Sequence, residues 1–121
     1  WEYAARGGNK SKGYTYSGGD AIDDVAWHEY NSGGMTHPVK TKAPNELGIY
    51  DMTGNVYEWC SDWYGSYSSA AQTDPTGPST GSYRLIRGGS WGSDATYCRV
   101  ASRGSSTPTF SYISLGLRLA Y

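Results

Sequence analysis

The side chains best suited to binding an ion are oxygen-bearing ones gathered in one short loop. Asp51, Asn55 and Glu58 flank a turn that Gly54 closes. With the carbonyls of Gly54 and Val56 turned inward, these hard oxygens suit calcium, which takes six to eight oxygen ligands. We predict a structural calcium site at Asp51, Gly54, Val56 and Glu58. An Asx-capped turn, in which Glu58 accepts hydrogen bonds only from the backbone, explains the same residues, and the sequence leaves both interpretations open.

Sulfur and imidazole groups are the other side chains that could react or bind a metal. Cys60 and Cys98 allow either one disulfide or two free thiols, and a count of two does not decide between them. Two small buried side chains are the simpler interpretation. His28 and His37 have no Cys, Asp or Glu at a recognised metal-ligand spacing, so we expect loop or core positions for both.

The composition limits the classes of partner. A net charge of -1 gives none of the basic surface that phosphate contacts need, so no nucleic-acid partner is expected. No run of about 18 apolar residues occurs, so we expect no membrane segment and a soluble chain. The 17 glycines, 12 tyrosines and 17% charged residues predict many turns and few amphipathic helices.

Short elements must therefore position these groups within one domain, residues 1–121. The patterns predict a helix at 1–6, a helical turn at 21–28, and strands at 56–59, 83–87 and 115–120. A polar loop at 66–82 separates the first two strands. The pair Gly88 and Gly89 predicts a bulge or a close backbone approach. The predicted class is α+β, mostly loops and short antiparallel strands with little regular secondary structure.

Six blocks, taken in order, resemble the formylglycine-generating enzyme (sulfatase-modifying factor) family. They are WEYAARG (1–7), NELG (45–48), DMTGNVYEW (51–59), RGGSW (87–91), CR (98–99) and GLRLA (116–120). The resemblance implies a C-type-lectin-like fold and calcium bound at the positions of Asp51, Gly54, Val56 and Glu58. A further stretch precedes the first block in the family, so this chain is expected to lack the N-terminal part of such a domain.

The resemblance breaks at the catalytic cysteines. Active members hold copper through two cysteines five positions apart, and five positions before Cys98 stands Ser93. A hydroxyl is a poor ligand for a soft metal that selects thiolates. We therefore expect no copper and no catalytic residue, with Cys98 a buried thiol, and we predict that the chain is not an enzyme.

Residues 92–114, here called the biased segment, have an unusual composition. Trp, Lys, Glu, Gln and Met are all absent, although these five types fill 16 of the first 91 positions, a share that corresponds to about four residues in the segment. The segment resembles the variable region of diversity-generating-retroelement variable proteins, which share this fold. There, template adenines are randomised, so that AAY codons become NNY, which excludes the same five types. An ordinary Ser/Thr-rich loop remains the plain alternative.

This resemblance implies that fixed and varied positions alternate along the segment. Trp91, Arg99, Arg103 and Leu117 are expected to be buried or fixed by hydrogen bonds. Tyrosines with small polar residues are typical of paratopes. The predicted ligand-binding residues are Gly92, Ser93, Asp94, Thr96, Tyr97, Ser102, Gly104, Ser105, Ser106, Thr107, Phe110, Ser111, Tyr112, Ile113 and Ser114.

These observations favour a binding module whose ligand is a protein or another macromolecule. Parts outside this chain would display it at a cell or particle surface. The alternative is an oxidase of the sulfatase-modifying type or a related metal-dependent enzyme, whose metal site would have to lie largely outside these residues. A sugar-binding lectin is a third possibility, but no Glu-Pro-Asn or Gln-Pro-Asp signature accompanies the calcium loop.

Overall fold

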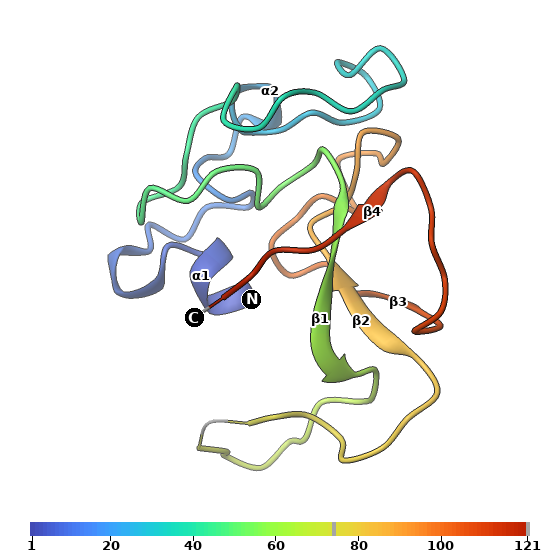
Figure 1. Cartoon of the computed structure of the whole chain (residues 1–121). Coiled ribbons are helices and arrows are strands. Elements are labelled where there is room, and N and C mark those ends of the chain that lie inside the picture. The colour runs from blue at the N-terminus through green and yellow to red at the C-terminus, as the bar shows by residue number, and fades with distance from the viewer. Residues whose placement is uncertain (74, 121) are drawn as a thin grey trace.

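A computed structural model describes residues 1–73 and 75–120, most of them in loops (Figure 1). Within these residues the elements are two helices, one 3-10 turn and four strands. In chain order they are α1 (Glu2–Ala5), η1 (Gly8–Lys10), α2 (Ile22–Val25), β1 (Tyr57–Trp63), β2 (Arg84–Arg87), β3 (Gly104–Ser106) and β4 (Leu115–Gly116). The predicted class, with little regular structure, is confirmed.

The strands form one sheet in the order β3-β2-β1-β4. β1 pairs antiparallel with β2, as predicted. β3, which no pattern predicted, also pairs antiparallel with β2, whereas β4 runs parallel to β1, so the prediction of antiparallel strands is wrong for β4. The last strand, predicted over 115–120, is only two residues long. Beyond it, Arg118 holds the chain near β1 through its side chain, which donates to Glu58 and to the carbonyl of Tyr50.

The hydrophobic core between α1 and the sheet is small. Ala5, Met52 and Val100 are its buried members. Polar side chains supplement it: buried Arg87 donates from Nη1 to the carbonyl of Ser102 at 2.6 Å and from Nη2 to the carboxylate of Glu2. Hydrogen bonds from side chains thus satisfy backbone carbonyls that longer strands or helices would satisfy in a more regular fold.

Gly88 and Gly89 bring two parts of the chain into close contact. Both have left-handed backbone angles, with φ of 96° and 73°. A Cβ at Gly89 would lie 2.6 Å from Cys98 Sγ, closer than two such atoms can approach. The predicted close backbone approach is confirmed. It places the first part of the biased segment in contact with the chain just after β2.

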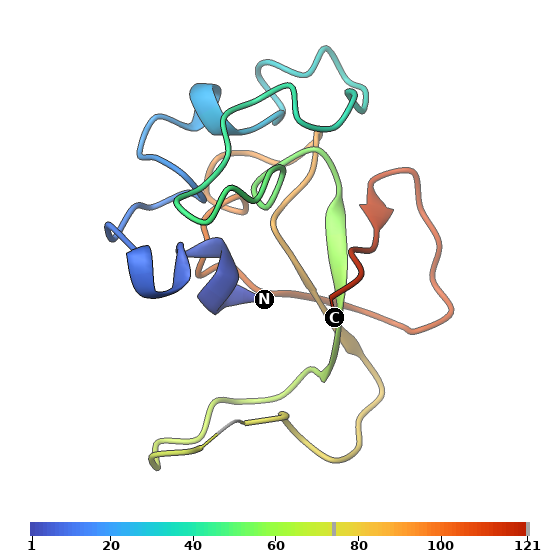
Figure 2. The same cartoon turned by 60° about the vertical axis from the view of Figure 1, so that its left-hand side comes forward.

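The loop between β1 and β2 extends away from the rest of the molecule (Figures 1 and 2). It begins at Tyr64, whose N–H donates to the carbonyl of Tyr83 at 2.8 Å. Position 74 of this loop lies outside the described residues. In the described part of the chain, no helix has the length and apolar character that crossing a membrane requires.

Candidate functional site

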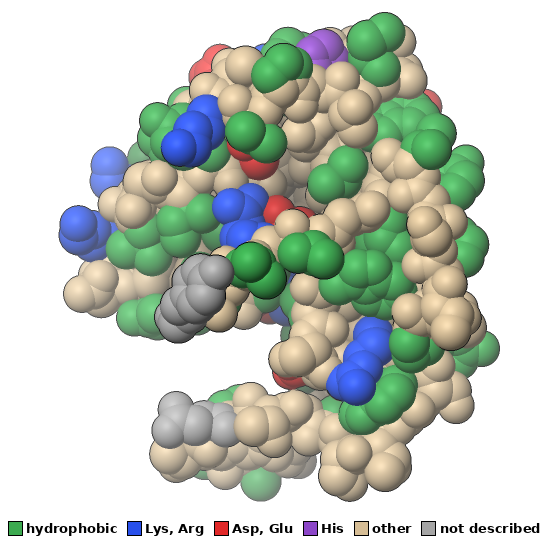
Figure 3. Space-filling view, viewed as in Figure 1, with side chains coloured by type: hydrophobic (Ala, Val, Ile, Leu, Met, Phe, Trp, Pro, Cys, Tyr) green, Lys and Arg blue, Asp and Glu red, His purple; other side chains and the backbone are tan. Residues whose placement is uncertain are grey.

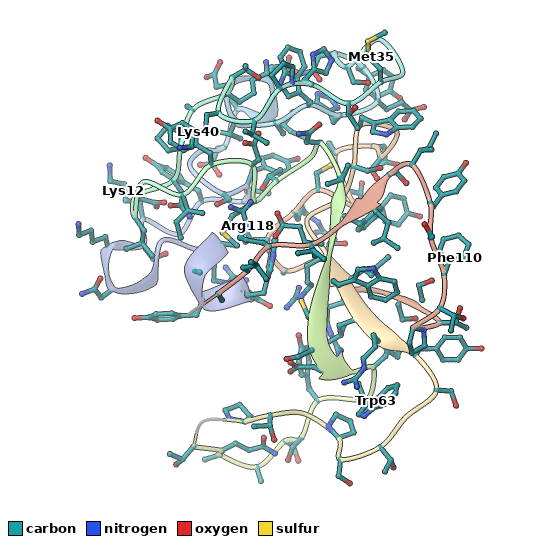
Figure 4. The ribbon with its side chains drawn as sticks, in the orientation of Figure 1. Lys12, Met35, Lys40, Trp63, Phe110 and Arg118 are labelled. Carbon is teal, nitrogen blue, oxygen red and sulfur yellow. The ribbon has the colours of Figure 1, made fainter. Side chains whose placement is uncertain are left out.

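The biased segment begins against the core and then runs along the outer edge of the sheet. Its second part passes through β3 and then runs along the surface to residue 114, just before β4 (Figure 1). Its four large side chains are well exposed: Tyr97 to 57%, Phe110 to 47%, Tyr112 to 57% and Ile113 to 70%. The rings of Phe110 and Tyr112 stack at 5.9 Å. Figure 4 places Phe110 at the outer edge, on the far side of the sheet from α1.

The fifteen predicted ligand-binding residues differ in burial. Nine are exposed: Gly92, Thr96, Tyr97, Ser105, Thr107, Phe110, Ser111, Tyr112 and Ile113. Five are half-buried: Asp94, Ser102, Gly104, Ser106 and Ser114. Only Ser93 is buried. Fourteen of the fifteen therefore present some surface to a ligand.

The prediction that Ser93 faces solvent is wrong, because its hydroxyl closes a small internal network. Ser93 Oγ accepts from the N–H of Ser90 at 3.0 Å and lies 3.2 Å from Ser90 Oγ. It also donates to the phenol of Tyr57 at 3.4 Å. Burial raises the pKa of Tyr57, which keeps the phenol neutral beside Ser93. Ser93 fastens the first turn of the biased segment to β1.

Three of the four positions predicted to be fixed are held by hydrogen bonds. The N–H of Trp91 donates to the carbonyl of Asn55 at 2.8 Å, and Arg99 Nε donates to the carbonyl of Thr96 at 3.1 Å. Arg103 Nη2 donates to the carbonyl of Gly65 at 2.8 Å. The fourth prediction is wrong: Leu117 is 70% exposed, because β4 ends one residue before it.

Both cysteines are free thiols, which answers the question that the sequence left open. Cys98 is fully buried, and burial with the nearby carboxylate of Asp94 raises its pKa to about 12. Its Sγ lies 4.0 Å from the carbonyl oxygen of Ser93. Burial also raises the pKa of Cys60. At neutral pH both sulfurs are therefore protonated and are not the thiolates that nucleophilic attack needs.

The predicted calcium ligands only partly converge. Asp51, Val56 and Glu58 line one pocket of about 450 Å³, whereas Gly54 is not among its lining residues. Arg118 lines the same pocket and lies at the centre of the molecule in Figure 4. Among the described residues, no group of three or more His, Cys, Asp or Glu side chains could hold an ion.

The carboxylate of Glu58 is already neutralised within this pocket. Arg118 Nη2 donates to its Oε1 at 2.7 Å, and Trp1 Nε1 donates to its Oε2 at 2.7 Å. Asp51 Oδ2 accepts from the N–H of Lys40 at 2.8 Å. A calcium ion at this site would have to displace the guanidinium or share Glu58 with it, so calcium binding stays a prediction.

The turn formed by residues 28–32 lies against the biased segment, and the sequence patterns did not assign it to the site. The N–H of Glu29 donates to the carbonyl of Ser93 at 3.0 Å, and Ser32 Oγ donates to the carbonyl of Trp91 at 2.8 Å. These contacts join positions about sixty residues apart, which no local pattern could have predicted.

Comparison with known proteins places this geometry in a family. The model of the sulfatase-modifying factor enzyme 1-like domain matches residues 1–121. Formylglycine-generating enzyme from Streptomyces coelicolor is 39% identical over 138 residues, which cover 99% of this chain and 44% of that protein. Serine/threonine-protein kinase Pkn1 from Chlamydia trachomatis is 43% identical over 125 residues, which cover 99% of this chain and 20% of the kinase. The chain thus spans less than half the length of these relatives.

Solved structures share the fold over nearly the whole chain. Treponema denticola variable protein 1 has a TM-score of 0.89 at 41% identity, covering 97% of this chain and 43% of that one. PvdO from Pseudomonas aeruginosa has a TM-score of 0.74 at 28% identity, covering 96% of this chain and 47% of that one. The likeness therefore extends both to enzymes and to a protein named for its variability.

Proposed function

The chain belongs to the sulfatase-modifying factor enzyme 1-like domain family, and we propose that within this family it is a ligand-binding variable protein of a diversity-generating retroelement. Its C-type-lectin-like scaffold presents the exposed positions of the biased segment to a protein or another macromolecular ligand. The observation that carries the proposal is the exposure of Tyr97, Phe110, Tyr112 and Ile113 within that segment. The likeness to Treponema denticola variable protein 1 supports it.

The chemistry of these positions is that of a binding surface. Rigid rings provide contact area at a low entropic cost, and small hydroxyl residues adapt their hydrogen bonds around them. The backbone beneath is fixed at both ends: the N–H of Tyr57 donates to the carbonyl of Ser114 at 2.8 Å, and β3 pairs with β2. Side chains here can change while the scaffold keeps its shape.

A display library tests the proposal. NNY codons are placed at the nine exposed positions in one library and at Trp91, Cys98 and Val100 in another, and yeast display with protease challenge measures the folded fraction. We expect most clones of the first library to fold and few of the second. Equal losses in both libraries would refute the proposal.

In the coding DNA, we expect a near-identical repeat with AAY codons at the varied positions, beside a reverse-transcriptase gene.

An oxidase of the formylglycine-generating type is the second candidate function, because curated relatives are enzymes. In that family two thiolates hold copper, and the residues present here do not fit it, since Ser93 replaces one thiolate and Cys98 is a buried thiol with its pKa raised to about 12. We expect no tight stoichiometric binding in a Cu(I) titration of the reduced protein. Ser93→Cys provides the comparison for a restored pair. Tight binding at Cys98 of the unaltered chain, with oxidation of a cysteine peptide, would favour the enzyme.

A further inference from the structure

We infer that the binding face continues from the biased segment onto the turn at residues 28–32, where Tyr30 and Glu29 make fixed contacts with a protein ligand that presents a basic side chain beside an apolar one. This inference rests on the proposed function and adds to it. The varied positions would select among ligands, whereas the turn would contribute the same contacts to each of them.

Hydrogen bonds hold the turn more tightly than an exposed loop requires. The carbonyl of His28 accepts from the N–H groups of Asn31 at 3.2 Å and Ser32 at 3.0 Å. The side chain of Asn31 accepts from the N–H of His28 at 2.8 Å and donates to the carbonyl of Ala26 at 2.9 Å. Two further bonds tie the turn to this part of the chain: Glu29 bonds to Ser93 of the biased segment, and Ser32 bonds to Trp91 just before it. A side chain projecting from this turn is therefore held on a preorganised backbone.

The side chain that projects is Tyr30, which is 81% exposed. Its ring contacts the buried ring of His28 edge to face, with centroids 6.0 Å apart. Met35, in the same loop, is 59% exposed. Aromatic side chains on rigid backbones are the usual anchors of protein interfaces, because ordering them on binding costs little.

Tyr30 lies next to the varied surface. The turn and residues 91–97 are side by side in both cartoon views (Figures 1 and 2), as the bond from Glu29 to Ser93 requires. Figure 3 shows hydrophobic side chains along the upper right-hand edge, where these segments and the exposed part of 104–114 lie, and no Lys or Arg side chain there. One ligand can therefore contact the turn and the varied positions together.

Charge indicates what the ligand presents. Segments 28–36, 92–97 and 104–114 contain two carboxylates, Glu29 and Asp94, and no Lys or Arg. Glu29 is exposed, so its charge is accessible to a partner. Arg99 lies between the last two of these segments, is exposed, and donates from its Nε to the carbonyl of Thr96. An acidic rim beside exposed aromatic rings complements a basic residue with apolar neighbours.

Peptide selection followed by calorimetry tests the inference. The probe is a phage-displayed library of random linear peptides, selected on the whole chain, and the strongest binders are then synthesised. We expect Lys or Arg beside aromatic or aliphatic residues in these peptides. Tyr30→Ala should weaken their binding by about tenfold, the scale of an interface hot spot. Glu29→Gln should weaken it less and reduce its salt dependence. Tyr3→Ala removes another largely exposed tyrosine, on α1, and should leave binding unchanged.

The outcomes separate this inference from the proposed function. If Tyr97→Ala and Tyr112→Ala abolish binding while Tyr30→Ala and Glu29→Gln do not, the turn is not part of the face, yet the proposed function stands. If none of the four changes matters, both fail. Selected peptides that are acidic or neutral would overturn the charge argument. Circular dichroism confirms that each variant is folded before its binding is measured.

Discussion

The two parts of the biased segment share one composition and differ in how they are held. In the first part, residues 92–100, Ser93, Cys98 and Val100 are buried. In the second part, residues 104–114, every side chain is exposed or half-buried. Serine thus forms internal hydrogen bonds in one stretch, at Ser93, and lies at the surface in the next, at Ser105. A diversified face needs both, since the free surface depends on anchors at its ends.

We expect the largest loss of stability from breaking the ion pair that anchors the chain just after the second part of the biased segment. Arg118 follows β4, and its ion pair with Glu58 ties the end of the chain to β1. Glu58→Ala leaves the guanidinium and Trp1 Nε1 without their acceptor. We expect a loss of about 3 kcal/mol in unfolding free energy, at the low end for a broken buried pair because Arg118 is partly exposed. Urea unfolding measures it, and Glu58→Gln, which keeps an acceptor, should lose less.

The same variant tests the proposed calcium site at Asp51, Gly54, Val56 and Glu58. With an ion in place, a chelator should lower the melting temperature of the unaltered chain and should not affect Glu58→Ala, because ligands that bind the folded state stabilise it. If the chelator leaves the unaltered chain unchanged, the Arg118 ion pair stabilises this loop without a metal.

Ser93→Ala tests whether the first part is fastened as the hydrogen bonds indicate. The change removes the acceptor of the buried N–H of Ser90 and the donor to Tyr57. A buried group left without a partner costs about 1 to 3 kcal/mol, and we expect a loss of about 1 to 2 kcal/mol. Ser105→Ala, an exposed serine in β3, is the matched control in the same denaturation assay. Equal effects for the two serines would remove the contrast between the two parts.

Features that depend on local sequence patterns could be predicted, whereas features that depend on contacts between distant segments could not. The fold could be predicted, because ordered blocks such as DMTGNVYEW at 51–59 and RGGSW at 87–91 carry the turns and the glycines that its close contacts need. The exposure of Tyr97 and Tyr112 could be predicted, because the composition of their segment resembles that of a variable surface. The burial of Ser93 could not, since a serine fits surface and interior equally well and only the contacts of Ser90 and Tyr57 decide.

Other errors have the same origin in long-range contacts. The alternation of 115–120 predicts a strand, but pairing with β1 stops after Gly116 and Leu117 is exposed. The side chain of Arg118 turns to Glu58 instead. The place of Tyr30 could not be predicted, because an exposed tyrosine in a polar turn has no distinctive pattern. Its position beside Ser93 depends on a hydrogen bond between distant segments.

Titration of Cys98 provides a smaller test of the buried first part. Burial raises the pKa of this thiol from 9.0 to about 12, so between these values the folded chain keeps a proton that the unfolded chain releases. Stability must therefore fall as the pH rises through this window. We expect a loss of about 1 kcal/mol between pH 8 and pH 10 that Cys98→Ala does not show. Parallel slopes for the two proteins would mean that the thiol is open to solvent.

The smallest expected effects are in the second part, and they test the comparison most directly. Phe110, Tyr112 and Ile113 are large and apolar, so burial of any of them would make its replacement by Ala cost several kcal/mol. Because they are exposed, each change should shift the unfolding free energy by no more than about 0.5 kcal/mol. The stacking of Phe110 on Tyr112 makes their double replacement the most demanding case, since any coupling appears as a departure from additivity. Additive, near-zero losses in urea denaturation would mean that the face is free to vary, whereas a loss above about 2 kcal/mol at any of the three would mean that its side chain supports the fold.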